Sequence, residues 1–479
     1  MTQLTSASST PLFYSAFLQN TVSHLQHGAW RLPEAEQTRM NDVDLWVDLA
    51  RTLEAGGFDM VFFADMAGLV HEFAGGIEKL VTIGLHIPCN DPMVLVSAMA
   101  AATERLGIAF TSSILQQHPF EFARKMSTLD HATRGRIGWN VVTGMSDNAA
   151  RNFGLEELLG HDERYEWAEE YMEVVYKLWQ ASWDDEALVM DKDAGLVADP
   201  RHVHRINHKG TRYSVQGPHL VTPSPQRVPF LFQAGASARG RDFAAKHAEV
   251  VFLLSPTPAI AGRDAADIRS RCVTFGRKPE DIRIMQGLTV VVADTHAGAE
   301  AEAARIDETL DDAAYVAFAG GVMGVDLGGE DLDRPIGEVR QHGTESALAW
   351  LRQAIPDREP TIRDIARIHR SAGRIVGTPS EVADAIQAWA DAGIDGVNLI
   401  NYTVPGSYVS FIKLVMPELR RRGLARDQHD GQPATIRRRF GGSDRPDERH
   451  PAHQYLRSLT IDTIGTIGTI GTIDKEWSS

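Results

Sequence analysis

The sequence predicts an α/β protein built on a (β/α)8 TIM barrel, and three observations support this fold class. Eight short apolar runs, rich in β-branched and aromatic residues, recur along the 479 residues. Most of them are apolar on both faces, as parallel strands covered on both sides are. Helical patterns lie between them without a break into two domains, which favours a closed barrel over an open doubly wound sheet.

The apolar runs give the strands in chain order. The eight predicted strands are Phe13–Phe17, Met60–Ala64, Gly107–Ser112, Ile137–Val142, Pro229–Ala234, Val250–Leu254, Ile282–Val291 and Gly396–Ile400. The helix before the last strand has the clearest start, because Thr378 and Glu381 have the spacing of a capping box. Val382, Ile386 and Trp389 then repeat at helical spacing and predict its buried stripe.

Three spacings are too long for plain barrel units. Residues 65–93, 146–228 and 292–377 are therefore predicted insertions after strands two, four and seven. All three follow the carboxyl ends of strands, where barrel enzymes build their sites, so we expect them to shape a pocket and its lid. The predicted division is a single barrel over residues 1–425 and a C-terminal arm and tail over residues 426–479.

The C-terminal region has a different character. Arg437, Arg438 and Arg439 open a stretch rich in Asp, Arg, Gly and Pro, which we expect to be a surface arm that packs on a second subunit. The Thr-Ile-Gly repeat over residues 463–471 is low-complexity sequence, and we assign it no function.

Composition narrows the partners. With 48 Lys and Arg against 64 Asp and Glu, the net charge of −16 argues against nucleic acid or an anionic membrane as the main partner. Two cysteines, Cys89 and Cys272, are too few for a disulfide framework or a Cys-rich zinc site. No apolar run approaches the roughly 20 residues that span a bilayer, and the first ten residues lack signal-peptide character. We therefore expect a cytoplasmic protein with a small-molecule substrate.

Several common motifs are missing. No G-x-G-x-x-G follows a strand and no Walker-type loop is present, which argues against a bound dinucleotide or nucleotide. The turn at 235–239 nearly matches a nucleophile elbow, but Arg239 replaces its closing Gly. His202, His204 and His208 have spacings that suit a metal, yet no carboxylate or cysteine of metal-site spacing accompanies them. We therefore assign no metal ligand.

Polar residues at strand ends are the candidate binding groups. Gly235 and Ser237 lie where a strand turns into a helix, so backbone N–H groups, a hydroxyl and the helix dipole could seat a phosphate. The same turn could instead serve only close packing. Asn140 lies within a buried strand, and a heterocycle with donors and acceptors would satisfy its amide. Asp65 ends another strand at the catalytic face.

These residues belong to longer motifs that carry a resemblance. The motifs are Asn140-Val141-Val142-Thr143, Phe63-Ala64-Asp65, His161-Asp162-Glu163-Arg164-Tyr165, Ser224-Pro225-Gln226-Arg227 and Gln233-Ala234-Gly235. With them, the chain from about Phe13 to Leu424 resembles the bacterial-luciferase superfamily. It is most similar to the branch of two-component flavin monooxygenases that act on nitrilotriacetate, dibenzothiophene sulfone, dimethyl sulfide and long-chain alkanes.

The resemblance implies a cofactor and partners. Such barrels bind reduced FMN (FMNH2) supplied by a separate NAD(P)H:flavin reductase, and use O2 as co-substrate to oxygenate a small organic molecule. A homodimer or homotetramer is the expected assembly. By matching positions, the isoalloxazine would lie near Asp65, Ser112 and Asn140, and the ribityl phosphate near Tyr165, Gly235 and Ser237, with Val142 and Ala234 completing the cofactor-binding set.

The substrate side departs from the alkane branch. His24 and His86 are the candidate catalytic residues, and His24 matches a histidine that the alkane and sulfide branches retain; a structural role for His24 is the alternative. Thr21, Val70, Met145 and Phe318 are the candidate pocket residues, and their differences from the alkane branch argue against alkane hydroxylation. Polarizable walls and polar points at His86 and at Gln116-Gln117 favour a planar heteroaromatic or organosulfur substrate.

Four alternatives stay open. Riboflavin itself could be the substrate, with oxidative cleavage of its ribityl chain. A deazaflavin-dependent dehydrogenase uses the same barrel. A barrel hydrolase or lyase would use a metal at the His-rich segment, and a non-catalytic flavin-binding protein would lack a substrate pocket.

Overall fold

The computed structural model describes residues 11–70, 73–144, 146–235, 237–323, 326–328, 331–339, 351–352, 355, 357–426 and 434–456. Met145, a predicted pocket residue, lies outside these residues. The Thr-Ile-Gly repeat, which has no predicted role, lies outside them too.

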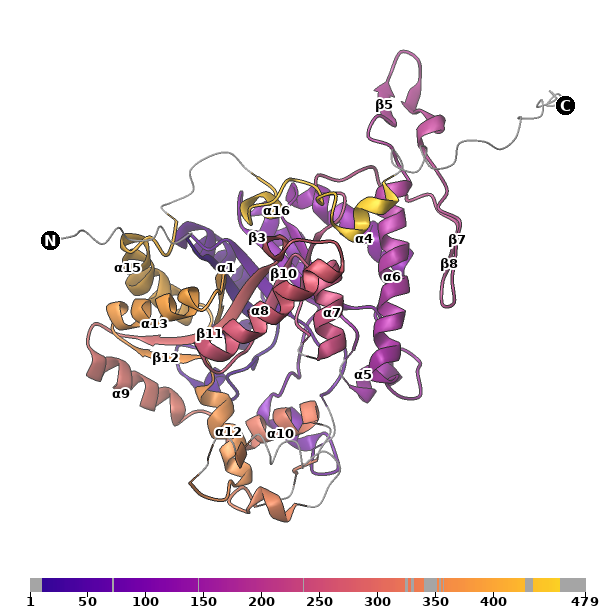
Figure 1. The fold of residues 1–479 in the computed structure, drawn as a ribbon. Helices are drawn as coiled ribbons and strands as arrows, with labels where there is room; N and C mark the ends of the chain where they lie inside the picture. The colour runs from indigo at the N-terminus through magenta and orange to yellow at the C-terminus, as the bar shows by residue number, and fades with distance from the viewer. Residues whose placement is uncertain are drawn as a thin grey trace.

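Eight parallel strands close into a ring, which confirms the predicted (β/α)8 barrel (Figure 1). Each strand pairs with the next, and the pairing of β10 with β11 closes the ring. A ninth strand, β12 (Arg374–Gly377), pairs with the carboxyl end of β11 and lies outside the ring. The ring strands are β1 (Phe13–Gln19), β2 (Met60–Ala64), β3 (Gly107–Ser113), β4 (Ile137–Val142), β9 (Phe230–Gln233), β10 (Val250–Leu253), β11 (Arg283–Val292) and β13 (Gly396–Ile400).

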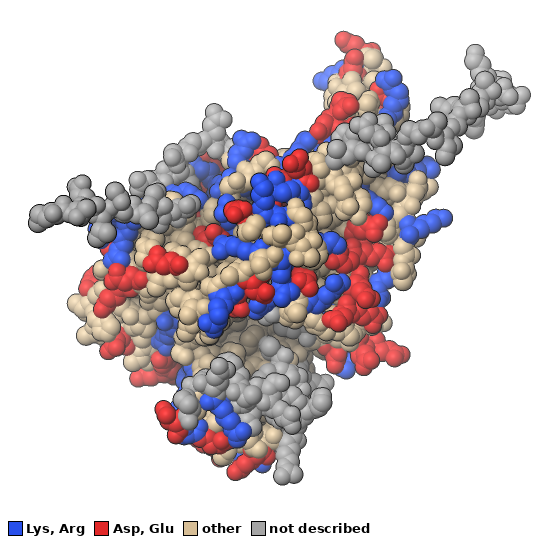
Figure 2. Space-filling view, viewed as in Figure 1, with Lys and Arg blue, Asp and Glu red and all other residues tan. Residues whose placement is uncertain are grey.

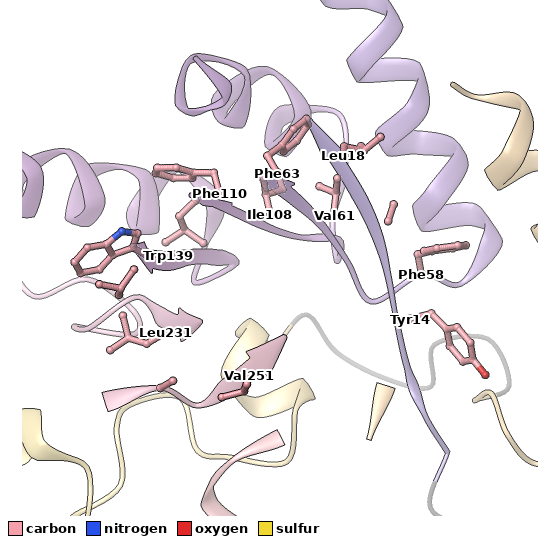
Figure 3. Packing of buried hydrophobic residues seen from close by; sticks show 14 of the residues in the cluster. Tyr14, Leu18, Phe58, Val61, Phe63, Ile108, Phe110, Trp139, Leu231 and Val251 are labelled. Carbon is pink, nitrogen blue, oxygen red and sulfur yellow. The ribbon is translucent and has the colours of Figure 1, made fainter. Parts of the chain in front are cut away.

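Alternating residues of each strand fill the barrel and face the helices. Inside, Phe62 of β2 lies 5.5 Å from Phe17 of β1 and 5.4 Å from Phe232 of β9, measured between ring centroids. Outside, Phe63, Phe110 and the other side chains labelled in Figure 3 pack toward the helices. Because both faces are buried, the strands are continuously apolar, which is why the sequence reveals them.

The helices that cover the ring include the predicted helix before the last strand. Its capping box at Thr378 and Glu381 is formed, and Val382, Ile386 and Trp389 are buried, as predicted. The covering helices are α1 (Val43–Gly56), α3 (Val96–Ala101), α4 (Pro119–Thr133), α6 (His161–Ala181), α7 (Ala238–His247), α8 (Pro258–Thr274), α13 (Pro379–Asp391), α14 (Gly406–Ser410) and α15 (Met416–Arg421), with a π-helical turn over Phe411–Val415.

The amino end of the barrel is closed by the C-terminal region. Helix α16 (Ile436–Arg439) buries Ile436 and is followed by Phe440, whose ring stacks on Phe13 at 4.1 Å. Arg437 is also buried and pairs with Glu249. The expectation of a surface arm is therefore wrong for Ile436, Arg437 and Phe440, which are buried in the core of the same chain, whereas its packing on a second subunit stays a prediction.

The segments after β2 and β11 pack together into a second small core beside the barrel (Figure 1). It contains α2 (Glu78–Ile83), α10 (Asp312–Met323) and α12 (Ile362–Ser371), while α9 (His296–Asp307) packs on β12. The segment after β4 holds α5 (Asp147–Asn152), the barrel helix α6, and two hairpins. The hairpin strands are β5 (Leu188–Asp191), β6 (Leu196–Ala198), β7 (His208–Lys209) and β8 (Ser214–Val215), and the β5–β6 hairpin projects away from the barrel (Figure 1).

Short 3-10 turns connect these elements: Ala29–Arg31, Glu36–Arg39, Pro92–Leu95, Pro200–His202, Pro279–Asp281, Ile336–Glu338 and Pro451–Tyr455. Figure 2 shows basic and acidic side chains interspersed over one face of the molecule. Among the described residues, no helix has both the length and the apolar character required to cross a bilayer.

Candidate active site

A cleft of about 240 Å³ lies at the carboxyl ends of β2, β3, β4 and β9. Five of the predicted cofactor-binding residues line it: Asp65, Val142, Tyr165, Ala234 and Gly235. Residues from the segments after β2 and β4, such as Met66 and Phe153, complete the wall. This is the edge where parallel barrels collect their functional groups.

Asp65 is a half-buried acid at one side of the cleft. Gln116 donates from Nε2 to Asp65 Oδ2 at 3.1 Å, and the thiol of Cys89 lies 3.9 Å from Oδ1. Burial outweighs the Gln116 hydrogen bond and raises the pKa of Asp65 to about 6. Burial and the nearby Asp65 likewise raise the pKa of Cys89 to about 12, so this thiol stays protonated. Asp65 can therefore exchange a proton near neutral pH.

Asn140 lies inside the barrel below the cleft. Its amide nitrogen donates to Thr111 Oγ1 at 2.9 Å, and Thr111 itself lines the cleft. Its Oδ1 is buried and has no hydrogen-bond partner among the residues that the structure describes. A buried carbonyl oxygen without a partner costs about 1–3 kcal/mol, so it marks a place where a ligand N–H would be favourable.

The start of α7, next to the lining residues Tyr165 and Gly235, has the features of a phosphate seat, although Ser237 and His161 do not themselves line the cleft. Ser237 caps α7 by accepting from Gly240 N at 3.0 Å, and its hydroxyl also lies 2.9 Å from His161 Nε2. The Tyr165 hydroxyl is hydrogen-bonded to Ser237, although burial dominates and raises its pKa. A Cβ at Gly235 would lie 2.9 Å from the Gly240 backbone, so the strand turns tightly into the helix.

One predicted residue points elsewhere. In β3, Thr111 and Ser113 line the cleft, whereas Ser112 does not and donates its hydroxyl to Gln116 Oε1 at 3.0 Å. Side chains alternate along a strand, so Ser112 shares the outward face of Phe110. The interior position facing Asn140 is Thr111, with which it is paired in the sheet. Ser112 therefore does not line the cleft, whereas Thr111 and Ser113 do.

The candidate catalytic histidines form a buried group beside the cleft. His86 donates from Nε2 to the carbonyl oxygen of His24 at 2.9 Å, and its Nδ1 lies 2.6 Å from the sulfur of Met66. His24 packs edge-on against Phe17 at 4.5 Å, and its Nδ1 has no partner. Burial lowers the pKa of His86 to about 4 and that of His24 well below its usual value, so both are neutral. Neither lines the cleft.

The candidate pocket residues do not form one surface. Thr21 is buried and donates its hydroxyl to the carbonyl oxygen of Pro88 at 2.7 Å. Val70 is also buried. Phe318 lines a separate cavity, with its ring centroid 5.3 Å from that of His86.

The His-rich segment has carboxylate neighbours that its spacing does not reveal. Asp184 Oδ2 lies 2.9 Å from His202 Nδ1 and 3.1 Å from His204 Nε2, and Glu186 lies 3.6 Å from His202. Antiparallel pairing of Trp183 with Val203 at the base of the β5–β6 hairpin brings them together. Asp184 and Glu186 therefore accompany these histidines in space, although they are not at a metal-site spacing in the sequence. None of these residues lines the cleft, and pairing with Asp184 accounts for the histidines.

Sequence reasoning missed several residues at the cleft. Gln116 lines the cleft, and in addition to the expected polar contact it holds Asp65 and accepts from Ser113 N at 2.6 Å. His161 belonged to a motif without a role, and Gln233, whose Oε1 accepts from Gly235 N at 2.5 Å, shapes the turn. Strand alternation from Asn140 would have found Thr111, and Gln233 belonged to the motif Gln233-Ala234-Gly235 but was given no role.

The comparisons with known proteins agree with this arrangement. The model of the luciferase-like monooxygenase family matches residues 20–396. The chain belongs to this family. It is 40% identical over 447 residues to dimethyl-sulfide monooxygenase of Hyphomicrobium sulfonivorans, covering 92% of this chain and 93% of the relative.

Solved structures show the same barrel. Long-chain alkane monooxygenase superposes with a TM-score of 0.85 at 40% identity, covering 93% of this chain and 99% of that one. Riboflavin lyase, solved with a modified FMN and riboflavin, superposes with a TM-score of 0.83 at 34% identity, covering 93% and 99%. The chain is thus an oxidoreductase of the luciferase-like monooxygenase family, whose two-component members use reduced flavin and O2.

Proposed function

We propose that this protein is the oxygenase component of a two-component system. It takes reduced FMN from a separate NAD(P)H:flavin reductase and uses O2 to oxygenate a small organosulfur or heteroaromatic molecule in a catabolic pathway. Bound reduced flavin and O2 together supply the oxygenating chemistry. The chain's own residues hold the flavin, orient it and keep water away.

The observation that carries the proposal is the unpartnered Oδ1 of Asn140 below a cleft whose lining residue Tyr165 is hydrogen-bonded to Ser237. An aromatic heterocycle with an N–H group would satisfy the amide oxygen. The hydroxyl of Ser237, the N-terminus of α7 and His161 lie beside Tyr165 and suit a phosphate. A flavin mononucleotide has both groups in one molecule, so the residues present fit this cofactor.

Asp65 has a distinct part in this scheme. Its pKa of about 6 lets it hold a proton beside the bound ring below that pH and accept one above it. Gln116 fixes the carboxylate through the 3.1 Å hydrogen bond. His24 and His86 are neutral beside the cleft. We propose that His24, whose Nδ1 has no partner among the described residues, orients substrate or flavin by hydrogen bonding, and that His86 positions His24 through its carbonyl oxygen.

A reoxidation experiment tests this function. Photoreduced FMN is mixed with O2 in the presence of excess protein, and flavin absorbance is followed by stopped flow. We expect bound reduced FMN to reoxidise more slowly than free reduced FMN and to bind more tightly than a deazaflavin coenzyme. Reoxidation at the free rate, or preferential binding of the deazaflavin, would show that the proposal is wrong.

The assembly is proposed to be a homodimer or homotetramer. Apolar side chains exposed on the β5–β6 hairpin support association between copies; they are Leu188, Val189, Met190, Leu196 and Val197. Light scattering should give two or four chains per particle, and Val197→Lys should lower the number of chains per particle toward one. The two unpaired cysteines support a cytoplasmic location.

Riboflavin as substrate is a second candidate, favoured by the structural likeness to riboflavin lyase. Incubating the protein with riboflavin, a flavin reductase and O2 distinguishes the two. Loss of the ribityl chain from riboflavin would support this alternative, and intact riboflavin would leave it without support.

A further inference from the structure

A second cavity, of about 100 Å³, lies at the carboxyl ends of β11 and β13. Its wall comes from the barrel and from the second small core, so it lies where the two parts of the chain meet. The lining residues that carry the argument are Gln26, His27, Gln286, Thr289, Tyr315 and Phe318.

The imidazole of His86 lies between lining residues of this cavity and of the flavin cleft. His86 contacts Met66 of the cleft through Nδ1, while its ring lies 5.3 Å from Phe318 and 5.7 Å from His27 of the cavity. His86 has a φ of 54°, in the left-handed region that non-glycine residues rarely adopt. The surrounding structure therefore holds it in this place, where it links Phe318 and His27 of the cavity to Met66 of the cleft.

The cavity wall carries no formal charge. Among the described residues that line it, there is no Asp, Glu, Lys or Arg. Burial lowers the pKa of His27 well below its usual value and also lowers that of His369, so both imidazoles are neutral at pH 7. A charged ligand would lose its hydration without gaining an opposite charge.

The polar side chains of the wall are nearly all paired. Gln26 donates to Thr289 Oγ1 at 3.3 Å and accepts from the Tyr315 hydroxyl at 2.9 Å. Gln286 donates to the carbonyl oxygen of Ser255 at 3.0 Å. Within the described lining, His27 Nε2 is the buried side-chain nitrogen that has no partner, since its Nδ1 pairs with Ser23 Oγ at 3.2 Å.

We infer that this cavity is the substrate chamber and that it selects an uncharged molecule with few heavy atoms and one hydrogen-bonding atom, which meets His27 Nε2. The volume of about 100 Å³ is smaller than a cavity of roughly 150 Å³ that holds benzene. A short dialkyl thioether fits, whereas a fused heteroaromatic or a carboxylated substrate does not. The inference rests on the proposed function and narrows its substrate to small uncharged organosulfur compounds.

A matched pair of probes tests the selectivity. Ethyl methyl sulfide and (methylthio)acetate share the CH3–S–CH2 unit and differ by a carboxylate. Binding to the full chain is measured by ligand-observed NMR, with and without oxidised FMN. We expect the sulfide to bind at least about tenfold more tightly than the acetate. Equal binding of the two probes would overturn the inference.

Variants test the residues. His27→Phe keeps a ring but removes Nε2, and should weaken sulfide binding about tenfold while FMN affinity is unchanged. The control is His219→Phe, which alters another buried histidine with one unpartnered nitrogen outside both cavities and should leave sulfide binding unchanged. Phe318→Arg places a guanidinium in the wall and should raise the relative affinity for (methylthio)acetate.

The outcomes separate this inference from the proposed function. Unchanged sulfide binding in His27→Phe, or no gain for (methylthio)acetate in Phe318→Arg, would overturn the assignment of the chamber. If the parent protein does not bind FMN but still binds the sulfide more tightly than (methylthio)acetate, the proposed function is wrong and the selectivity of the chamber is unaffected.

Discussion

The two ends of the barrel differ in whether their buried polar side chains are fully hydrogen-bonded. At the amino end, Arg437 is buried, and its three guanidinium nitrogens are hydrogen-bonded to Glu249 and to backbone carbonyl oxygens. At the carboxyl end, Asn140 is buried with its amide oxygen unpartnered. The first arrangement completes the fold, whereas the second leaves a binding group ready for a ligand. Changes at the two ends should therefore affect different measurements.

The largest effect is expected at the amino end. Arg437→Met leaves Glu249 as a buried carboxylate without its partner, which typically costs about 3–5 kcal/mol of the free energy of unfolding. Urea denaturation measures this loss, and the folded variant should bind FMN as the parent does. Arg438→Met is the matched control, because Arg438 is 60% exposed. A loss in Arg437→Met no larger than that in Arg438→Met would contradict this role.

The next effect is a pH dependence at the cleft. The pKa of Asp65 is raised to about 6 in the folded protein, so the folded state binds more protons than the unfolded state between about pH 4 and 6. Its contribution to the free energy of unfolding therefore falls as pH rises, by about 2 kcal/mol after allowing for partial exposure. The difference between the parent and Asp65→Asn, each measured without FMN, should show this slope. Asp48→Asn, at an exposed position of α1, should not.

A smaller effect concerns cofactor affinity. Asn140→Ala removes the unpartnered oxygen and should weaken FMN binding about tenfold, with little loss of stability. Asn398→Ala is a matched control, since Asn398 also has a buried, unpartnered Oδ1 but lies on β13, on the opposite side of the ring. FMN affinity is measured by flavin fluorescence. If both variants weaken FMN binding equally, the assignment of the isoalloxazine ring to the Asn140 side of the barrel is wrong.

The smallest effect separates FMN from riboflavin. Ser237→Ala should weaken FMN binding several-fold and leave riboflavin binding unchanged, because only FMN has a phosphate for this hydroxyl. Loss of the helix cap also costs about 1 kcal/mol of stability. Thr257→Ala removes the equivalent cap of α8 and controls for that loss. If both flavins weaken alike in Ser237→Ala, the phosphate does not bind here.

Most of the fold could be predicted because each strand is apolar on both faces. The differences from the structure have physical causes. Ser112 was assigned to the cofactor without considering that alternate side chains face opposite ways, which places Thr111 inside. The arginine-rich segment was taken as surface by composition, but Glu249, far away in sequence, allows Arg437 to be buried.

Site residues could be predicted where a single strand or helix positions them. They could not be predicted where several segments meet in space. Asp65, Val142, Tyr165, Ala234 and Gly235 line the cleft because each follows or ends a recognisable element. The second cavity depends on segments from β1, β11, α10 and α12 meeting in space, and nothing in the local sequence shows that meeting. The pairing of Asp184 with His202, 18 residues apart, depends likewise on a hairpin.

The central claim is that one cleft holds FMN, with the ring beside Asn140 and the phosphate beside Ser237. A crystal structure of the protein with FMN tests it most directly. The account predicts a flavin N–H donating to Asn140 Oδ1 and the phosphate within hydrogen-bond distance of Ser237 Oγ. Flavin density in the cavity beside His27, or a phosphate away from the start of α7, would contradict it.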